Sequence, residues 1–426
     1  MEVVKKVFVA LCRVLIASIF WLAIRVGTSL TIHGVKQDTG VPRTYLGMMH
    51  KRDIDPFILV PTIVFHRGWR GLAGDVRFAL RADGFTRGYL ARMLGHTNLL
   101  TRLLRPLSIG PILRWLGAYP SESLLRPAEE WIREVLQIDG DLTAEAILAP
   151  AFLQDFARLT RLSVEQVRAL PLTRLLAWRN YTALQKFYGP EMLLSTKRRS
   201  IERRVAARIH ECLDDIATCL WQDGSFFGSP EGQLSPDGRI SSLHAGFQRI
   251  VRAAPPDLRI VPISLSYDFM TSARRHVFVA FAPALAYAPK LSSAELASRL
   301  RRSWLQHASF TCTQLASGYL LACRTDSRTE FTLADLSYAI YQQACTLVAA
   351  GRAVDPRLLR LSSATKRARS YLAYVERRGL IACVAPNRWR IAFTELTIDI
   401  GPREVAYDDV PLLYAYNELQ DLLSVS

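Results

Sequence analysis

Residues 44–56 read TYLGMMHKRDIDP, and this stretch decides the fold that we expect for the chain. Residues 44–49 are an apolar run with the length of a buried strand, and the run ends at His50. Asp55 and Pro56 then open a helical pattern, with proline in the first turn, where a helix tolerates it. A strand that leads directly into a helix is typical of α/β domains.

The same alternation continues along the chain. Four more segments have the apolar, β-branched composition of strands, namely residues 29–32, 76–80, 258–267 and 276–281. Residues 198–221 instead have the pattern of a long amphipathic helix. Strands that alternate with helices predict an α/β fold whose mostly parallel sheet is flanked by helices.

Changes in composition divide the chain into segments. We expect a membrane-docking helix over residues 1–28 and a large α/β domain over 29–308, with a leucine-rich helical insertion at 124–197. A C-terminal helical domain should follow over 309–426. Its residues 371–393 read as helix, strand, turn and strand, which is typical of a winged-helix-like domain.

The N-terminal segment is apolar from Val7 to Val26, interrupted by Arg13 and Arg25. Its uninterrupted part, residues 14–24, is short for a membrane-spanning helix. A helix that lies in the membrane interface, with its arginines reaching the head groups, fits this pattern. A buried core helix is the alternative, since short apolar runs are ambiguous.

The chain is basic, with 54 Lys and Arg against 38 Asp and Glu and a formal net charge of +16. Such a surplus favours an anionic partner, which could be nucleic acid, an anionic membrane face or a phosphorylated substrate, and charge alone does not choose among them. Together with the apolar N-terminal segment, it leads us to expect a location at the cytoplasmic face of a membrane. The seven cysteines form no C-x-x-C pair and have no zinc-finger spacing. We therefore expect reduced thiols and no metal site.

His50 and Asp55 form an H-x4-D motif at the junction of a strand and a helix. Acyl transfer to an alcohol requires a base that takes the hydroxyl proton, and an imidazole suits that role near neutral pH. A carboxylate on its other nitrogen fixes the tautomer. No G-x-S-x-G motif supplies a serine nucleophile, so the substrate hydroxyl would attack directly. By its spacing alone, His50 is better explained as a loop histidine.

Two later motifs join this pair. Residues 229–239 contain two glycine turns after an apolar strand, at the sheet edge where α/β proteins bind ligands. Residues 261–267 form a strand with proline near its start. Taken alone, the first could be a surface turn and the second a core strand.

The order of the three motifs resembles the glycerolipid acyltransferase superfamily, which includes glycerol-3-phosphate and lysophosphatidate acyltransferases. The resemblance covers residues from about 30 to 305. It implies an acyl thioester or acyl phosphate donor, such as acyl-CoA or acyl-carrier protein, and no other cofactor. It also implies His50 and Asp55 as the catalytic dyad and, as substrate-binding residues, Pro230, Glu231, Gly232, Arg239, Val261 and Pro262.

Two family arginines that bind the phosphate of the acceptor have no counterpart here. Ser121–Ser123 stand where the second motif usually has one, and Leu234 stands where one usually follows P-E-G. Arg239, Arg126 or Arg81 could substitute for them, so the acceptor stays open between glycerol 3-phosphate, a lysophospholipid and another hydroxyl compound.

The sequence thus predicts an enzyme that moves a fatty acyl group to a hydroxyl of a glycerolipid precursor at a membrane surface. One alternative is a nucleic-acid-binding protein that uses the basic C-terminal segment, although we do not expect nucleic acid as a partner. The other is a lipid-binding relative without catalysis, which the two missing arginines would suit.

Overall fold

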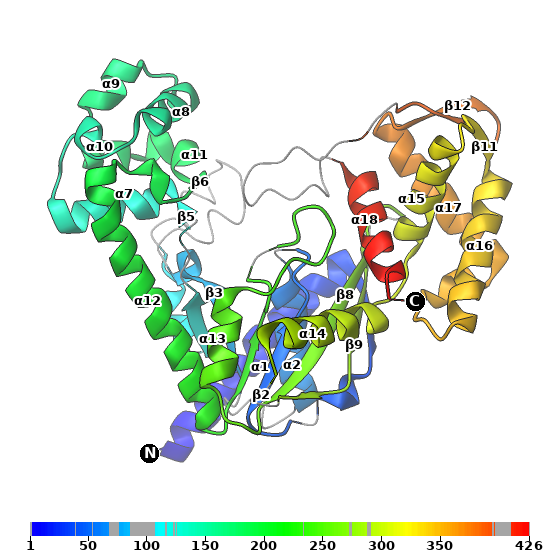
Figure 1. Ribbon diagram of the computed structural model, residues 1–426, viewed down its shortest axis with the longest axis horizontal. Coiled ribbons are helices and arrows are strands. Elements are labelled where there is room, and N and C mark those ends of the chain that lie inside the picture. The colour runs from blue at the N-terminus through cyan, green and yellow to red at the C-terminus, as the bar shows by residue number, and fades with distance from the viewer. Residues whose placement is uncertain are drawn as a thin grey trace. The chain divides into compact units, whose positions relative to one another are not determined.

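The computed structural model describes most of the chain, in two compact units (Figure 1). The first unit comprises Met1–Val76 and Thr218–Ser426, and the second comprises Arg77–Ala217. The helical segment predicted at 124–197 therefore belongs to a unit with wider limits. The described residues are 2–38, 40–52, 54–67, 76–85, 107–115, 117–121, 124, 126–232, 234–271, 275–287, 291–393, 396 and 410–425.

The first unit is built on a mixed, mostly parallel sheet, which confirms the α/β class. Its strands lie in the order β1-β9-β8-β2-β7. The pairs β1–β9, β8–β2 and β2–β7 are parallel, whereas β8–β9 and β10–β8 are antiparallel. The strands are β1 (Thr28–His33), β2 (Thr44–Met48), β7 (Ser225–Gly228), β8 (Arg259–Asp268), β9 (Arg275–Phe281) and β10 (Leu285–Ala286).

The central strands are buried on both faces. Every residue of β2 is buried, and so is every residue of β8 after Arg259. Near-continuous burial of this kind is expected for a sheet that helices cover on both sides. The flanking helices are α2 (Asp55–Arg67), α13 (Ala245–Ala253) and α14 (Ser293–His307).

Helix α1 (Glu2–Gly27) packs on α2 through one face. Ala10 and Ala17 are buried there, and the ring of Phe20 lies 5.2 Å from that of Phe57. The part Ala10–Gly27 is long and apolar enough to cross a membrane, the one such helix among the described residues.

The last part of the first unit is a helical layer with a small sheet. Strand β11 pairs with β13, and β13 with β12, all antiparallel. The predicted helix, strand, turn and strand between residues 371 and 393 are confirmed. In chain order the elements are α15 (Cys312–Thr325), β11 (Glu330–Thr332), α16 (Leu333–Ala349), α17 (Leu361–Arg377), β12 (Ile381–Ala385), β13 (Arg388–Ile391) and α18 (Pro411–Leu423).

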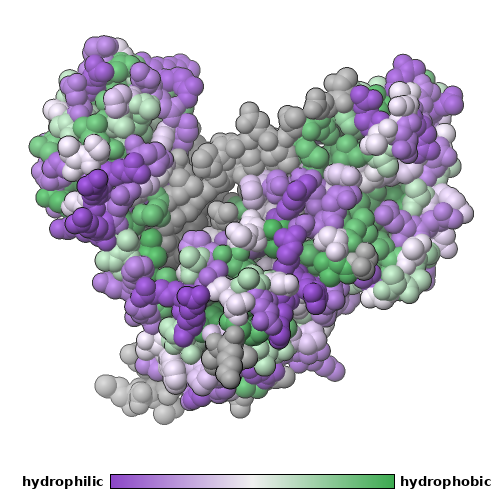
Figure 2. Space-filling view, in the orientation of Figure 1, coloured by the Kyte–Doolittle hydropathy of each residue, from purple (hydrophilic) through white to green (hydrophobic). Residues whose placement is uncertain are grey.

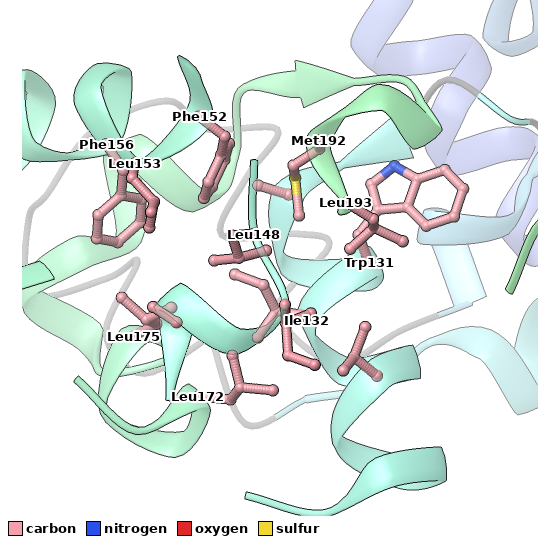
Figure 3. Packing of buried hydrophobic residues seen from close by; sticks show 14 of the residues in the cluster. Trp131, Ile132, Leu148, Phe152, Leu153, Phe156, Leu172, Leu175, Met192 and Leu193 are labelled. Atoms are coloured by element: carbon pink, nitrogen blue, oxygen red, sulfur yellow. The ribbon is translucent and has the colours of Figure 1, made fainter. Parts of the chain in front are cut away.

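The second unit is largely helical and has its own core. Trp131, Phe152 and Phe156 converge there with leucines from neighbouring helices (Figure 3). On the face drawn in Figure 2, hydrophilic residues are interspersed with apolar ones over these helices. The elements are β3 (Val76–Arg81), which begins at the unit boundary, α6 (Gly110–Trp115), β4 (Ala118–Ser121), β5 (Arg126–Pro127), α7 (Ala128–Asp139), α8 (Pro150–Thr160), α9 (Val164–Ala169), α10 (Leu172–Leu175), α11 (Tyr181–Leu184), β6 (Phe187–Tyr188) and α12 (Ser195–Trp221).

Candidate active site

His50 lies at the carboxyl end of β2, two residues after the strand ends at Met48. Helix α2 begins at Asp55, and the short loop between His50 and Asp55 lets the carboxylate contact the imidazole. His50 Nδ1 lies 3.1 Å from Asp55 Oδ2. The His50 side chain keeps 19% of its surface exposed, while that of Asp55 is fully buried. The two predicted residues are therefore in contact, and the imidazole is partly exposed to solvent.

The carboxylate of Asp55 is held by four hydrogen bonds. Its Oδ2 accepts the backbone N–H groups of Lys51 at 2.7 Å and Arg52 at 2.8 Å, besides the contact with His50. Its Oδ1 accepts the hydroxyl of Tyr267. A carboxylate with this set of donors acts as an acceptor toward His50, so Nδ1 carries the proton and Nε2 is left as the basic nitrogen.

Tyr267, the penultimate residue of β8, holds the carboxylate of Asp55 from within the core. Burial and the negative charge of Asp55 raise the pKa of Tyr267 well above its usual value, so its hydroxyl stays protonated and donates. The guanidinium of Arg52 stacks on two rings, at 4.8 Å from the centroid of Tyr267 and 4.5 Å from that of Phe269. These rings hold the loop between His50 and the start of α2.

Glu231 binds the loop of His50 through the main chain. Its Oε2 accepts the N–H of His50 at 2.9 Å, and its Oε1 accepts the N–H of Ser241 at 2.8 Å. Burial raises the pKa of Glu231, although these hydrogen bonds and the nearby Lys51 act in the opposite direction. Because the side chain is only 2% exposed, its contacts here are with the two loops.

The two neighbours of Glu231 fit tightly. The ring of Pro230 lies against Gly47, where a Cβ atom would approach it to 3.2 Å. Gly232 has φ +69°, and a Cβ atom there would lie 2.9 Å from the side chain of His244. Glycine is therefore required at 232 both for its backbone conformation and for space. Ser235 closes the turn by donating its N–H to the carbonyl of His50 at 2.9 Å.

Val261 and Pro262 lie inside the sheet. They pair in register with Leu46 and Gly47 of β2, and the carbonyl of Pro262 accepts the N–H of Ala282 at 2.9 Å. Both residues are buried. They therefore set the strand next to the dyad and do not line its open side.

The three arginines considered as phosphate ligands differ in their surroundings. Arg239 projects from the turn after P-E-G, with 60% of its side chain exposed and its Nε 4.0 Å from Asp237. Arg126 is buried in the second unit, over the ring of Trp131 and 3.7 Å from Glu134. The side chain of Arg81 lies outside the described residues.

Sequence reasoning missed Tyr267, Lys51 and Glu418. Lys51 and Glu418 form a buried ion pair, with Lys51 Nζ 3.4 Å from Glu418 Oε1. A signal existed for Tyr267, because a hydroxyl at the end of a buried strand needs a hydrogen-bond partner. Glu418 gave none, since its partner lies in a distant part of the sequence.

No model of a known protein family matches the chain, and no curated protein matches it in sequence. Among the described residues there is no group of three or more His, Cys, Asp or Glu that could hold a metal ion.

Proposed function

We propose that this chain is a membrane-associated O-acyltransferase of the glycerolipid acyltransferase type, with His50 as general base and Asp55 as its orienting carboxylate. The observation that carries the proposal is the 3.1 Å contact between His50 Nδ1 and Asp55 Oδ2, with the imidazole partly exposed and the carboxylate fully buried. Such a pair presents a basic nitrogen to a substrate and keeps its counter-charge away from water.

In the proposed reaction the acceptor hydroxyl gives its proton to His50 Nε2 while its oxygen attacks the carbonyl carbon of the acyl thioester. The tetrahedral intermediate then expels the thiolate, which takes the proton from the imidazolium, so the products are an ester and a free thiol. No acyl-enzyme forms, because the nucleophile is the substrate hydroxyl itself.

The acceptor would approach over the turn that follows P-E-G. Arg239 is the exposed cation of that turn and supports an acceptor or donor that carries phosphate. Pro230, Glu231 and Gly232 would shape this side of the site through the main chain, since Glu231 binds the N–H groups of both loops.

Helix α1 supports attachment to a membrane. One face packs on α2, and the opposite face presents large apolar side chains to solvent, including Leu11, Leu15 and Leu22. An exposed apolar stripe beside a basic body is suited to an anionic bilayer surface. We propose the cytoplasmic face of a membrane as the location.

We also propose a winged-helix-like fold for residues 312–391. The order helix, strand, helix, helix, strand, strand and the antiparallel sheet support it. Its third helix, α17, points Arg367 inward, where the guanidinium binds Asp268 and lies 3.5 Å from Asp355. This inward contact favours a role within the chain over nucleic-acid binding, and a sequence-selective footprint on DNA would reverse that preference.

The test is acyl transfer by the purified protein on lipid vesicles, with radiolabelled acyl-CoA or acyl-carrier protein and a panel of acceptors. We expect His50→Ala to lose activity by at least about a hundredfold, and mass spectrometry of the product to identify acceptor and chain length. Equal turnover by wild type and His50→Ala would exclude this site as catalytic. Lipid binding without turnover in either protein would favour the non-catalytic alternative.

A further inference from the structure

His50 has three backbone and side-chain anchors, and two of them, Ser235 and Asp55, lead to the same helix, α18. The N–H of His50 is bound by Glu231, its carbonyl by Ser235, and its ring by Asp55. Lys51 in turn holds Asp55, because its N–H donates to that carboxylate at 2.7 Å.

Lys51 then reaches α18 with its side chain. Its Nζ donates to the carbonyl of Gly238 at 2.7 Å and lies 3.4 Å from Glu418 Oε1, and both side chains of the pair are about 95% buried. Gln314 of α15 donates to the other oxygen of Glu418 at 3.2 Å. A buried ion pair with this many partners fixes geometry more than it adds stability.

Helix α18 also binds the turn that carries Ser235. Asn417 donates to the carbonyl of Asp237 at 3.0 Å, and Asp421 accepts the N–H of Ile240 at 2.7 Å. Gly238, at φ +94°, lies so close that a Cβ atom would approach the carbonyl of Tyr414 to 2.3 Å. The turn is therefore shaped against the helix along its length.

We propose that α18 is a positioning element of the active site and that Glu418 is its central positioning residue. Glu418 holds Lys51, Lys51 holds Asp55, and Asn417 and Asp421 hold the turn whose Ser235 binds His50. The C-terminal segment is thus part of the catalytic site and not an independent module. The claim that α18 affects turnover rests on the proposed acyl transfer. The claim that α18 holds the segments around His50 does not.

The test compares Glu418→Gln and Asn417→Leu with the matched control Glu330→Gln. The control removes an acid of the same segment that pairs with exposed arginines on β13. For both test variants we expect kcat to fall by about ten- to a hundredfold, the scale of a misplacement of about 1 Å. KM should stay within about threefold of wild type, because no substrate contact is lost.

Hydrogen exchange supplies a readout that does not depend on activity. The amides of Lys51 and Arg52 should exchange faster in Glu418→Gln, and that of Ser235 in Asn417→Leu, while β8 and β9 keep their protection. Wild-type kcat and wild-type exchange at these amides would overturn the proposal. So would uniform loss of protection with unchanged kcat, which would assign Glu418 to general stability. If the wild type showed no acyl transfer but the variants showed the expected faster amide exchange, the result would contradict the proposed acyl transfer and would leave the positioning role of α18 standing.

Discussion

The carboxylate of Glu231 joins two loops by accepting the N–H of His50 at 2.9 Å and that of Ser241 at 2.8 Å. Glu231→Gln keeps the shape but turns one acceptor into an NH2 group that faces a backbone donor. A buried donor left without a partner costs about 1–3 kcal/mol. We expect the free energy of urea unfolding to fall by about that amount and kcat to fall with little change in KM.

Glu295→Gln is the control for this change, since Glu295 pairs with Arg299 on the exposed side of α14. If Glu231→Gln instead raised the KM for the acceptor at an unchanged kcat, Glu231 would contact the substrate directly, as the family resemblance implies.

Tyr267 and Asp55 give a second prediction, because the phenol donates to the oxygen of Asp55 that does not face His50. Tyr267→Phe removes only that hydroxyl. We expect stability to fall by about 1 kcal/mol and kcat to fall about tenfold. Tyr45→Phe, which changes a buried tyrosine of the adjacent strand β2, should leave kcat near that of wild type.

A double-mutant cycle with Asp55→Asn locates the effect. If Tyr267 acts through Asp55, the double variant should be no slower than Asp55→Asn alone. Additive losses in kcat would instead assign Tyr267 to the packing of β8.

Much of this site could be predicted because its sequence signals are local. The run at 44–49 is apolar, and Asp55 follows His50 by only five residues. Proline at 56 suits the start of α2. The same reasoning predicted β8 and β9, whose sequences are rich in apolar and β-branched residues. Strand and helix periodicity carry this information without any tertiary contact.

The remainder depends on contacts between distant segments. Nothing in the sequence near Lys51 indicates that Glu418 will be its partner, or that β9 will run antiparallel to β8. The role of Glu231 was also hidden, because a carboxylate in a glycine turn has the same local sequence whether it points to a ligand or to backbone N–H groups. Only the fold decides which.

Asp155 in the second unit gives a prediction for acid stability. Burial alone would raise its pKa, but hydrogen bonds from Lys186, Tyr188 and Arg158 outweigh that effect and lower the pKa to about 2. A carboxylate with a depressed folded-state pKa stabilises the protein above its unfolded pKa of about 4, and this contribution is lost as the pH falls toward 2.

The measurement is urea unfolding of wild type and Asp155→Asn between pH 2 and 6. The difference in unfolding free energy between the two proteins should be constant above about pH 5 and should decline steadily below about pH 4. Asp326→Asn, which changes an exposed aspartate at the end of α15, should show no such decline. A difference independent of pH would mean that Asp155 acts through its shape and not through its charge.

The outward face of α1 gives the prediction for membrane binding. Six large apolar residues on this face are between 57% and 76% exposed, at the spacing of one helix face, namely Phe8, Leu11, Leu15, Ile19, Leu22 and Val26. Burying one such side chain contributes about 1.5–3 kcal/mol. The double change Leu15→Asp and Leu22→Asp should therefore weaken binding to anionic phosphatidylglycerol vesicles by at least about a hundredfold.

Co-sedimentation with these vesicles measures that loss, and turnover of a water-soluble short-chain acyl donor separates binding from catalysis. The double variant should keep its kcat on the soluble donor, because α1 contacts α2 through the opposite face. Val384→Asp, at an exposed apolar residue of β12, is the control for a charge placed elsewhere and should bind vesicles as wild type does. Unchanged vesicle binding by the α1 double variant would show that this helix does not contact the membrane. Attachment would then have to come from the basic surface by itself.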